Sequence, residues 1–308
     1  MKSYDAVVIG GGPAGITAAM YLARSGCSVL MPEELTPGGQ ILQTEALENY
    51  PGFPKGIKGY ELADLLSAHL DGLQVERPAA RVESVSGSAG NFIVCTNGEH
   101  ISARVVLVCS GAQHRKLGLD GEDRLRGHGV SYCALCDGNF FRGQSVAVVG
   151  GGNAAMEESL YLSKLVNKLY LIHRRDAFRG NKIYLEKLEK HTTNIEILRS
   201  SIVTKLHGVT SLTGLTVKNI NTGNEQLLPV DGLFIYVGFS ASADFLPPEI
   251  ERDAQGFLIT DTEMRTNIPG IFAAGDIRSK LCRQAITAAG DGATAAQAAF
   301  VFLEQLHA

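Results

Sequence analysis

The sequence lacks several features that would assign it to whole classes of protein. It has no run of 18 apolar residues, so no membrane-spanning helix is expected. Its 28 Lys and Arg residues stand against 32 Asp and Glu, and a net charge of −4 gives no basis for binding a nucleic-acid backbone. The N-terminus enters a strand-like segment directly, without an apolar leader and a cleavage site. We therefore expect a cytoplasmic protein that binds neither membranes nor nucleic acid.

Cysteine is also scarce, because six in 308 residues are too few for a secreted disulfide scaffold. Four are isolated in the sequence: Cys27, Cys95, Cys109 and Cys282. Cys133 and Cys136 form a C-x-x-C pair, a spacing typical of redox or metal chemistry. A structural zinc site needs four ligands, and no second Cys or His pair supplies them. The spacing favours a dithiol–disulfide couple over zinc or an inert buried pair, and no metal is expected.

Glycine, by contrast, is abundant, with 35 in 308 residues, and it is concentrated in two similar motifs. Each motif, at 10–15 and at 150–155, has the form G-x-G-x-x-G/A. Each follows an apolar strand-like segment and precedes a predicted helix, at 13–24 and at 154–165. Such β-α-β turns bind dinucleotide phosphates, with the phosphates at the helix N-terminus. The candidate phosphate-binding residues are Gly10, Gly12, Pro13, Ala14 and Gly15 in the first motif, and Gly150, Gly152, Asn153 and Ala154 in the second.

The length and the 45 % hydrophobic content suit two packed domains, so we expect an α/β fold with two Rossmann-like, nucleotide-binding domains. Further strands are expected at 103–110 and 231–237. An alanine-rich helix at 284–306 is interpreted mainly as a core helix.

The two nucleotide sites are expected to differ. In the second unit, the acidic residue that usually binds a ribose is replaced by the basic segment 173–179, which contains Arg174, Arg175 and Arg179. Arginines suit the 2′-phosphate of NADPH, although a solvated basic turn is the alternative. In the first unit, Asp276 follows an apolar strand, and its carboxylate suits the polyhydroxyl chain of a flavin. Asp137, directly after the cysteine pair, is a candidate proton donor to a thiolate, or simply part of an Asp-Gly turn.

Together these motifs resemble the low-molecular-weight, bacterial-type NADPH-dependent thioredoxin reductases, over residues 6–295. The matching stretches are 10–15, 38–40, 48–52, 133–138, 150–155, 173–179, 275–276 and 283–285. The resemblance implies an FAD-binding domain built from residues 1–114 and 244–308. An NADPH-binding domain, residues 115–243, is inserted between these segments and carries the cysteine pair. The resemblance also implies a homodimer.

The resemblance further implies the role of each residue. Cys136 faces the flavin, Cys133 attacks the disulfide of thioredoxin, and Asp137 is the general acid. The implied FAD contacts are Gly39, Gln40, Asn49, Gly275, Asp276, Arg283, Gln284 and Ala285. The implied NADPH contacts after the second strand are His173, Arg174, Arg175 and Arg179. Electrons pass from NADPH through FAD and the cysteine pair to thioredoxin, with a domain rotation between half-reactions.

The alternative is a related flavoprotein reductase that acts on another protein or on a small-molecule disulfide. A redox sensor with the same cofactors is a further hypothesis.

Three positions depart from the pattern expected for this family. Tyr132 is larger than the residue expected before Cys133. Asp291 and Gly292 stand where a Gly-Cys pair is frequent. After the strand predicted at 28–31, Pro32 precedes two acids, Glu33 and Glu34, so the residue that faces an adenosine ribose is not defined.

Overall fold

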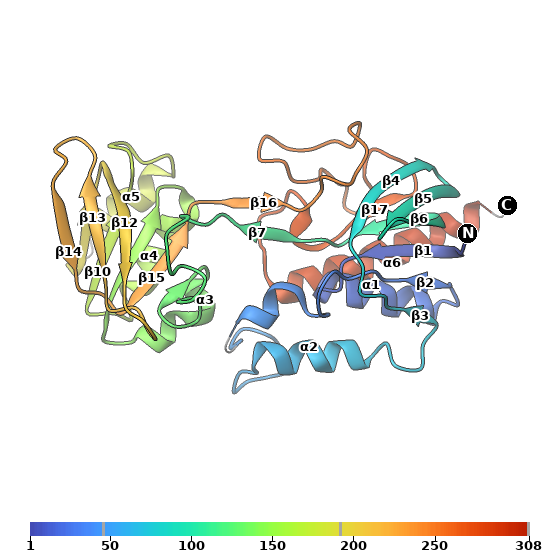
Figure 1. Ribbon diagram of the computed structural model, residues 1–308, viewed down its shortest axis with the longest axis horizontal. Helices are drawn as coiled ribbons and strands as arrows, with labels where there is room; N and C mark the ends of the chain where they lie inside the picture. Colours follow the sequence, from blue (N-terminus) through green and yellow to red (C-terminus); the bar gives the residue numbers. More distant parts are fainter. Residues whose placement is uncertain (45–46, 191–192, 307–308) are drawn as a thin grey trace. The chain divides into compact units, whose positions relative to one another are not determined.

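The computed structural model describes residues 1–44, 47–190 and 193–306, and these divide into two compact units (Figure 1). Unit 1 comprises Met1–Gln43, Tyr50–Gln113 and Ser240–Ala308, and unit 2 comprises Thr44–Asn49 and His114–Phe239. In the described part of the chain, no helix has the length and apolar character needed to cross a membrane.

Unit 1 contains a seven-stranded sheet in the order β3-β2-β1-β6-β5-β4, with β17 also paired to β6. Its strands are β1 (Ser3–Ile9), β2 (Val29–Leu30), β3 (Val75–Glu76), β4 (Val82–Ser88), β5 (Asn91–Thr96), β6 (Glu99–Val108) and β17 (Ile271–Ala273). The strands around β1 run parallel, whereas β4, β5 and β6 form an antiparallel meander. The predicted strand at 103–110 begins earlier than expected because its pairing with β5 extends it.

Two helices, α1 (Pro13–Arg24) and α6 (Ala285–Gln305), pack on one face of this sheet. Alternate strand residues such as Ala6, Val8 and Leu107 face these helices, and the intervening residues face a second apolar cluster. Small residues allow the close approach. A Cβ atom on Gly15 would lie 1.8 Å from the Gly10 carbonyl oxygen, and one on Gly292 would lie 2.2 Å from the Ala14 carbonyl oxygen. A third helix of this unit is α2 (Gly59–Ala68).

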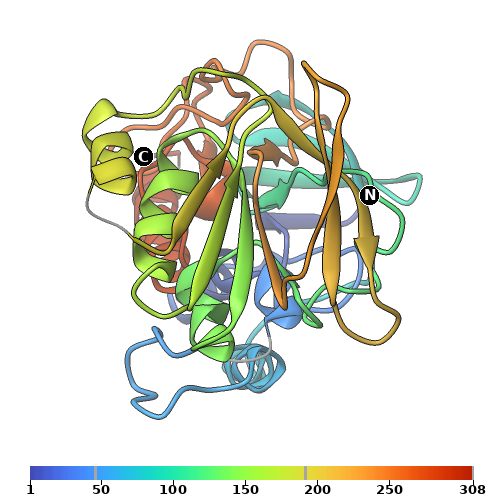
Figure 2. The same cartoon turned by 90° about the vertical axis from the view of Figure 1, so that its left-hand side faces the viewer.

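Unit 2 contains a five-stranded parallel sheet in the order β11-β10-β9-β15-β8. Its strands are β8 (Val130–Ser131), β9 (Ser145–Gly150), β10 (Lys168–Ile172), β11 (Ile195–Leu198) and β15 (Gly232–Tyr236). The helices α4 (Asn153–Leu162) and α5 (Lys182–Lys190) pack on one face through residues such as Met156, Leu162 and Leu188. On the other face lies a three-stranded antiparallel sheet of β12 (Ser201–His207), β13 (Gly214–Asn219) and β14 (Glu225–Leu228) (Figure 2).

The helix predicted at 154–165 begins at Asn153 and ends earlier than expected, at Leu162. The Asn194 side-chain amide donates to the carbonyl oxygens of Ser163 and Val166, both at 2.9 Å. These carbonyl groups therefore find partners outside a continued helix, and the chain turns toward β10.

Two short strands, β7 (Ala112–His114) and β16 (Phe239–Ala241), form a separate two-stranded sheet where the chain passes between the units. The Arg115 backbone N–H donates to the Gly238 carbonyl oxygen at 2.9 Å. These two crossings are therefore joined to each other by backbone hydrogen bonds.

Candidate active site

Cys133 and Cys136 are joined by a disulfide bond, with their Cα atoms 5.3 Å apart. Cys133 is the N-cap of a single helical turn, α3 (Ala134–Asp137), and this turn brings the second cysteine back to the first. The backbone N–H of Cys136 donates to the Cys133 Sγ atom at 3.2 Å. A backbone donor aimed at this sulfur would stabilise a thiolate there, which is the reactive form of cysteine. The predicted pairing of these two cysteines is confirmed.

Ser131, which the sequence analysis did not identify, connects Asp137 with the cysteine pair. Its hydroxyl donates to the Asp137 Oδ2 atom at 2.6 Å and accepts the backbone N–H of Cys133 at 3.1 Å. Ser131 is buried at the end of β8, and Asp137 ends α3. The carboxyl group is therefore held on the same short segment as both sulfur atoms.

A second unpredicted residue, Tyr236, contacts the redox turn from the end of β15. Its hydroxyl oxygen accepts the backbone N–H of Ala134 at 2.6 Å. Burial, followed by the charge of Glu158, raises the pKa of Tyr236 well above its usual value. The hydroxyl therefore stays neutral and holds the start of α3 against the carboxyl edge of the parallel sheet.

Glu158, on α4, is a half-buried residue near this tyrosine, and its Oε2 atom is buried. Its Oε2 atom has no hydrogen-bond partner among the described residues. Burial, and secondly the charge of Glu157, raise the pKa of Glu158 to about 7. The group thus holds a proton in the native protein under conditions in which an exposed glutamate has lost it.

A pH-dependent stability follows for this group. Because the native pKa lies above the reference value of 4.5, stability should fall as pH rises from about 4.5 to 7 and remain lower above that. Glu158→Gln should prevent this loss, which amounts to up to about 2–3 kcal/mol in the free energy of unfolding. The variant should thus match the parent protein at pH 4.5 and exceed it at pH 8 in thermal unfolding. Glu186→Gln, on the exposed face of α5, is the control, and an equal gain in that variant would contradict this assignment.

The glycine turn of unit 2 is closed by the basic segment that follows β10. The His173 ring packs against Gly151, where an added Cβ atom would lie 2.1 Å from the His173 Cε1 atom. The backbone N–H of Arg179 donates to the Gly151 carbonyl oxygen at 2.9 Å. His173 is buried and stacks on Phe178 with ring centroids 4.8 Å apart. The ring therefore supports the turn, and its contact with a nucleotide stays a prediction.

The remaining predicted nucleotide residues of unit 2 are accessible. Arg174, Arg175 and Arg179 are exposed, as are Asn153 and Ala154 at the start of α4. The N-cap of α4 is Gly152, which has no side chain to cap the backbone N–H groups of the first turn. Exposed guanidinium groups beside an uncapped helix N-terminus fit a phosphate-bearing ligand.

The glycine turn of unit 1 has the same construction. Gly10 has a φ of +103°, and a Cβ atom there would lie 2.6 Å from the Cys109 carbonyl oxygen. The Gly11 N–H donates to the Glu33 Oε2 atom at 2.6 Å, whereas Glu34 is exposed near Arg81. Glu33 is therefore the acid of this pair that lies against the turn. A Cβ atom on Gly39 would lie 3.2 Å from the Gly12 Cα atom, so the predicted residue Gly39 also reaches the turn.

Asp276 provides the test of whether unit 1 fits a polyhydroxyl cofactor. It lies in the short helix η3 (Gly275–Ile277), and its Oδ1 atom is buried without a hydrogen-bond partner among the described residues. Burial raises the pKa of Asp276 to about 6. A buried oxygen of this kind needs a donor, and a ligand hydroxyl would supply one. The site fits the flavin that the sequence predicts.

The other predicted FAD contacts have varied surroundings, and one of them, Asn49, belongs to unit 2. Gln284 is the N-cap of α6, where it forms a capping box with Thr287. The Arg283 guanidinium packs 4.0 Å from the Phe257 ring centroid. Gln40 and Asn49 are exposed. Their predicted contacts with a cofactor, like that of Ala285, stay predictions.

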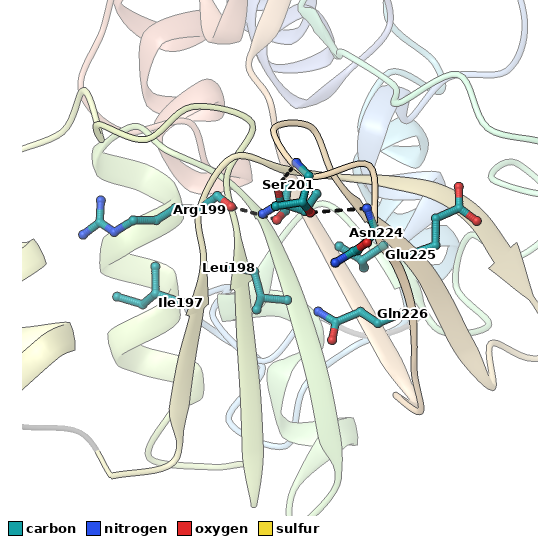
Figure 3. Close-up of a pocket in the computed structure, with 10 residues that line it drawn as sticks. Ile197, Leu198, Arg199, Ser201, Asn224, Glu225 and Gln226 are labelled. Atoms are coloured by element: carbon teal, nitrogen blue, oxygen red, sulfur yellow. Dashed lines mark hydrogen bonds between the residues drawn. The ribbon is translucent and has the colours of Figure 1, made fainter.

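A separate hollow of about 370 Å³ lies on unit 2 between β11 and the three-stranded sheet (Figure 3). Its lining includes Leu198, Ser201 and Asn224. None of the site residues predicted from the sequence lines it among the described residues. In the described ranges, no three His, Cys, Asp or Glu side chains gather closely enough to hold a metal ion.

Comparison with known proteins connects these features. The family model described as "Pyridine nucleotide-disulphide oxidoreductase" matches residues 4–292. A thioredoxin reductase of Listeria monocytogenes is 41% identical over 99% of this chain and 95% of its own. The chain belongs to this family, among the bacterial-type thioredoxin reductases.

Two other members extend the comparison. The crystal structure of thioredoxin reductase from Streptococcus pyogenes has a TM-score of 0.90 and 40% identity, and covers 98% of this chain and 99% of its own. A bifunctional thioredoxin reductase/thioredoxin of Mycobacterium leprae is 40% identical over 95% of this chain and 64% of its own. The predicted α/β fold with two Rossmann-like domains is confirmed. Family membership implies a flavin and a nicotinamide cofactor.

Proposed function

We propose that this chain is an NADPH-dependent thioredoxin-disulfide reductase. The observation that carries the proposal is the closed Cys133–Cys136 disulfide in the unit that also holds a glycine turn followed by exposed arginines. The nucleotide turn provides a binding site for the electron donor. The disulfide, in the same unit, provides the electron acceptor. The family relationship supports the same activity. The net reaction oxidises one NADPH and converts one thioredoxin disulfide and a proton into two thiols.

We assign FAD to unit 1 and NADPH to unit 2, as the sequence predicts. When bound, the flavin supplies a two-electron link between the nicotinamide and the disulfide. The FAD residues are the turn at 10–15, the segment around Gly39, and Asp276 with Arg283 and Gln284. The NADPH residues are the turn at 150–154, together with Arg174, Arg175 and Arg179. In this assignment the FAD domain comprises 1–114 and 244–308, and the NADPH domain comprises 115–243.

The protein residues then have distinct roles in disulfide exchange. Cys133, as a thiolate, attacks one sulfur of the partner disulfide and forms a mixed disulfide, releasing the other sulfur as a thiolate. Cys136 then attacks Cys133, which re-forms the internal disulfide and releases the partner as a dithiol. Asp137, held by Ser131, transfers the proton that a departing thiolate needs.

Because the nucleotide turn and the cysteine pair share unit 2, we propose that this unit rotates between two states. One state gives the nicotinamide access to the flavin, and the other gives the disulfide access. The paired crossings β7 and β16 are where such a motion would occur.

Thioredoxin is the proposed partner of this exchange. The Mycobacterium leprae relative, in which both activities belong to one protein, supports this choice. A homodimer in the cytoplasm remains our expectation from the family resemblance.

The test is NADPH consumption by the purified protein, with and without oxidised thioredoxin. Sustained consumption only when thioredoxin is present is the expected result. Consumption with a small-molecule disulfide but not with thioredoxin would favour the alternative reductase. A single stoichiometric oxidation of NADPH, with no acceptor sustaining turnover, would instead favour a redox sensor.

Ser131→Ala tests how the acid is held. Loss of a charge-assisted hydrogen bond to Asp137 should lower kcat about tenfold. The KM values for NADPH and thioredoxin should stay unchanged, because the hydroxyl binds neither. Ser163→Ala, which removes a hydroxyl at the end of α4, is the matched control. Equal kcat values for the two variants would show that Ser131 has no role in proton transfer.

A further inference from the structure

Asp291, on α6, forms a buried ion-pair cluster with Arg278 and Lys280. Its Oδ2 atom lies 3.0 Å from the Arg278 Nη1 atom and 2.8 Å from the Lys280 Nζ atom. The same atom accepts the Gly275 backbone N–H at 3.1 Å. The three charged side chains are only 9–13% exposed. One carboxylate oxygen thus receives two cations and a backbone donor in a largely dry environment.

All three donors belong to one segment, residues 275–280, and this segment carries Asp276. Arg283 also holds this segment through hydrogen bonds. Its Nη2 atom donates to the Arg278 carbonyl oxygen at 3.1 Å, and its Nη1 atom donates to the Lys280 carbonyl oxygen at 3.3 Å. The backbone on both sides of Asp276 is therefore fixed by side chains: Asp291 holds Gly275, and Arg283 holds the residues that follow.

Asp276 itself has the buried Oδ1 atom to which no described residue donates a hydrogen bond. Restraint of the backbone therefore helps to set its position, because no described residue hydrogen-bonds that oxygen. The Gly275 N–H that Asp291 accepts belongs to the peptide group between Ala274 and Gly275, one residue before Asp276. A carboxylate bound to that peptide restrains the backbone at Gly275, the residue that leads into Asp276.

We propose that Asp291 is a positioning residue for the flavin site. Through Gly275, Arg278 and Lys280 it holds the 275–280 segment so that the free oxygen of Asp276 faces the cofactor. This inference rests on the proposed assignment of FAD to unit 1. It gives a role to a residue for which the sequence predicts none.

The test is the rate of FAD release from the purified flavoprotein, followed by the recovery of flavin fluorescence on dilution. Asp291→Asn keeps the size of the side chain but leaves Arg278 and Lys280 without their anion. FAD release should accelerate about tenfold to a hundredfold, the range expected for loss of a charge-assisted buried hydrogen bond. The double variant Asp291→Asn/Lys280→Gln limits the charge imbalance and should fold more readily. Because this variant still lacks the carboxylate that fixes Gly275, it should also release FAD faster than the parent protein.

The matched control is Asp5→Asn at the start of β1. Asp5 accepts the Ser28 N–H and hydroxyl and pairs with Arg104 at 3.2 Å, so it resembles Asp291 chemically. It lies toward the amino end of β1, whereas the 275–280 segment follows the carboxyl end of β17. Asp5→Asn should lower the Tm and leave the FAD release rate unchanged. If the double variant releases FAD at the parental rate, Asp291 has only a structural role and the inference is overturned. If the parent protein binds no FAD, the cofactor assignment itself fails, which is a distinguishable result.

Discussion

Cys136→Ser is expected to reduce thioredoxin-dependent NADPH oxidation at least about a thousandfold, because the enzyme loses one member of a group that acts as a unit. The structure joins Cys133 and Cys136 directly, and a serine oxygen cannot replace either sulfur in a disulfide. Without the second sulfur, the mixed disulfide between Cys133 and the partner has no internal thiolate to resolve it. The two-electron couple is therefore absent, although Cys133 keeps its backbone donor environment.

Two measurements and one control variant make this result specific. Steady-state NADPH oxidation gives the loss of turnover, and calorimetric titration with NADP⁺ should give an unchanged affinity. Cys95→Ser is the control, because Cys95 lies on β5 in unit 1 and contacts Glu83 through a thiol that serine can mimic. Undiminished turnover in Cys136→Ser would show that electrons reach thioredoxin by another route. Equal losses in Cys136→Ser and Cys95→Ser would point to a general effect on folding.

Local sequence patterns predicted the nucleotide turns well, because the constraint at each turn involves neighbouring residues. Gly10 and Gly15 meet within one strand-turn-helix unit, so their spacing alone indicates the close packing that the structure contains. The same holds for Cys133 and Cys136, whose pairing within one helical turn follows from a two-residue separation. The three-stranded sheet β12–β14 carries no comparable motif and was not predicted.

The supporting residues of the site were not predictable in this way, because their contacts connect distant parts of the sequence. Tyr236 meets Ala134 across 102 positions, a contact that depends on the neighbouring placement of β15 and β8 in the sheet. Ser131 lies close to Asp137 in sequence, but a serine two residues before a cysteine has many ordinary uses. Asp291 has no role that could be predicted from the sequence alone. Its ion pairs depend on how the 275–280 segment folds back onto α6.

The double variant Arg174→Ala/Arg175→Ala is expected to raise the KM for NADPH by about a hundredfold to several thousandfold. Loss of two charge-assisted hydrogen bonds to the 2′-phosphate should cost about 3–5 kcal/mol in total. Both guanidinium groups are exposed. The backbone of their segment is hydrogen-bonded to the glycine turn, and the buried His173 ring packs against that turn. Because the alanine substitutions leave this packing intact, the turn should keep its form. NADH has no 2′-phosphate, so its KM should stay nearly unchanged.

The control must separate a specific phosphate contact from a change in overall charge. Lys187→Ala/Lys190→Ala also removes two positive charges from unit 2, but from the last turn of α5. If long-range attraction of the anionic cofactor were the cause, both double variants would raise the KM for NADPH similarly, and raised salt would reduce the difference from the parent protein. A direct contact requires a large effect in the arginine variant alone. Equal losses with NADPH and NADH would instead mean that these arginines shape the turn for any dinucleotide, and the 2′-phosphate assignment would then be wrong.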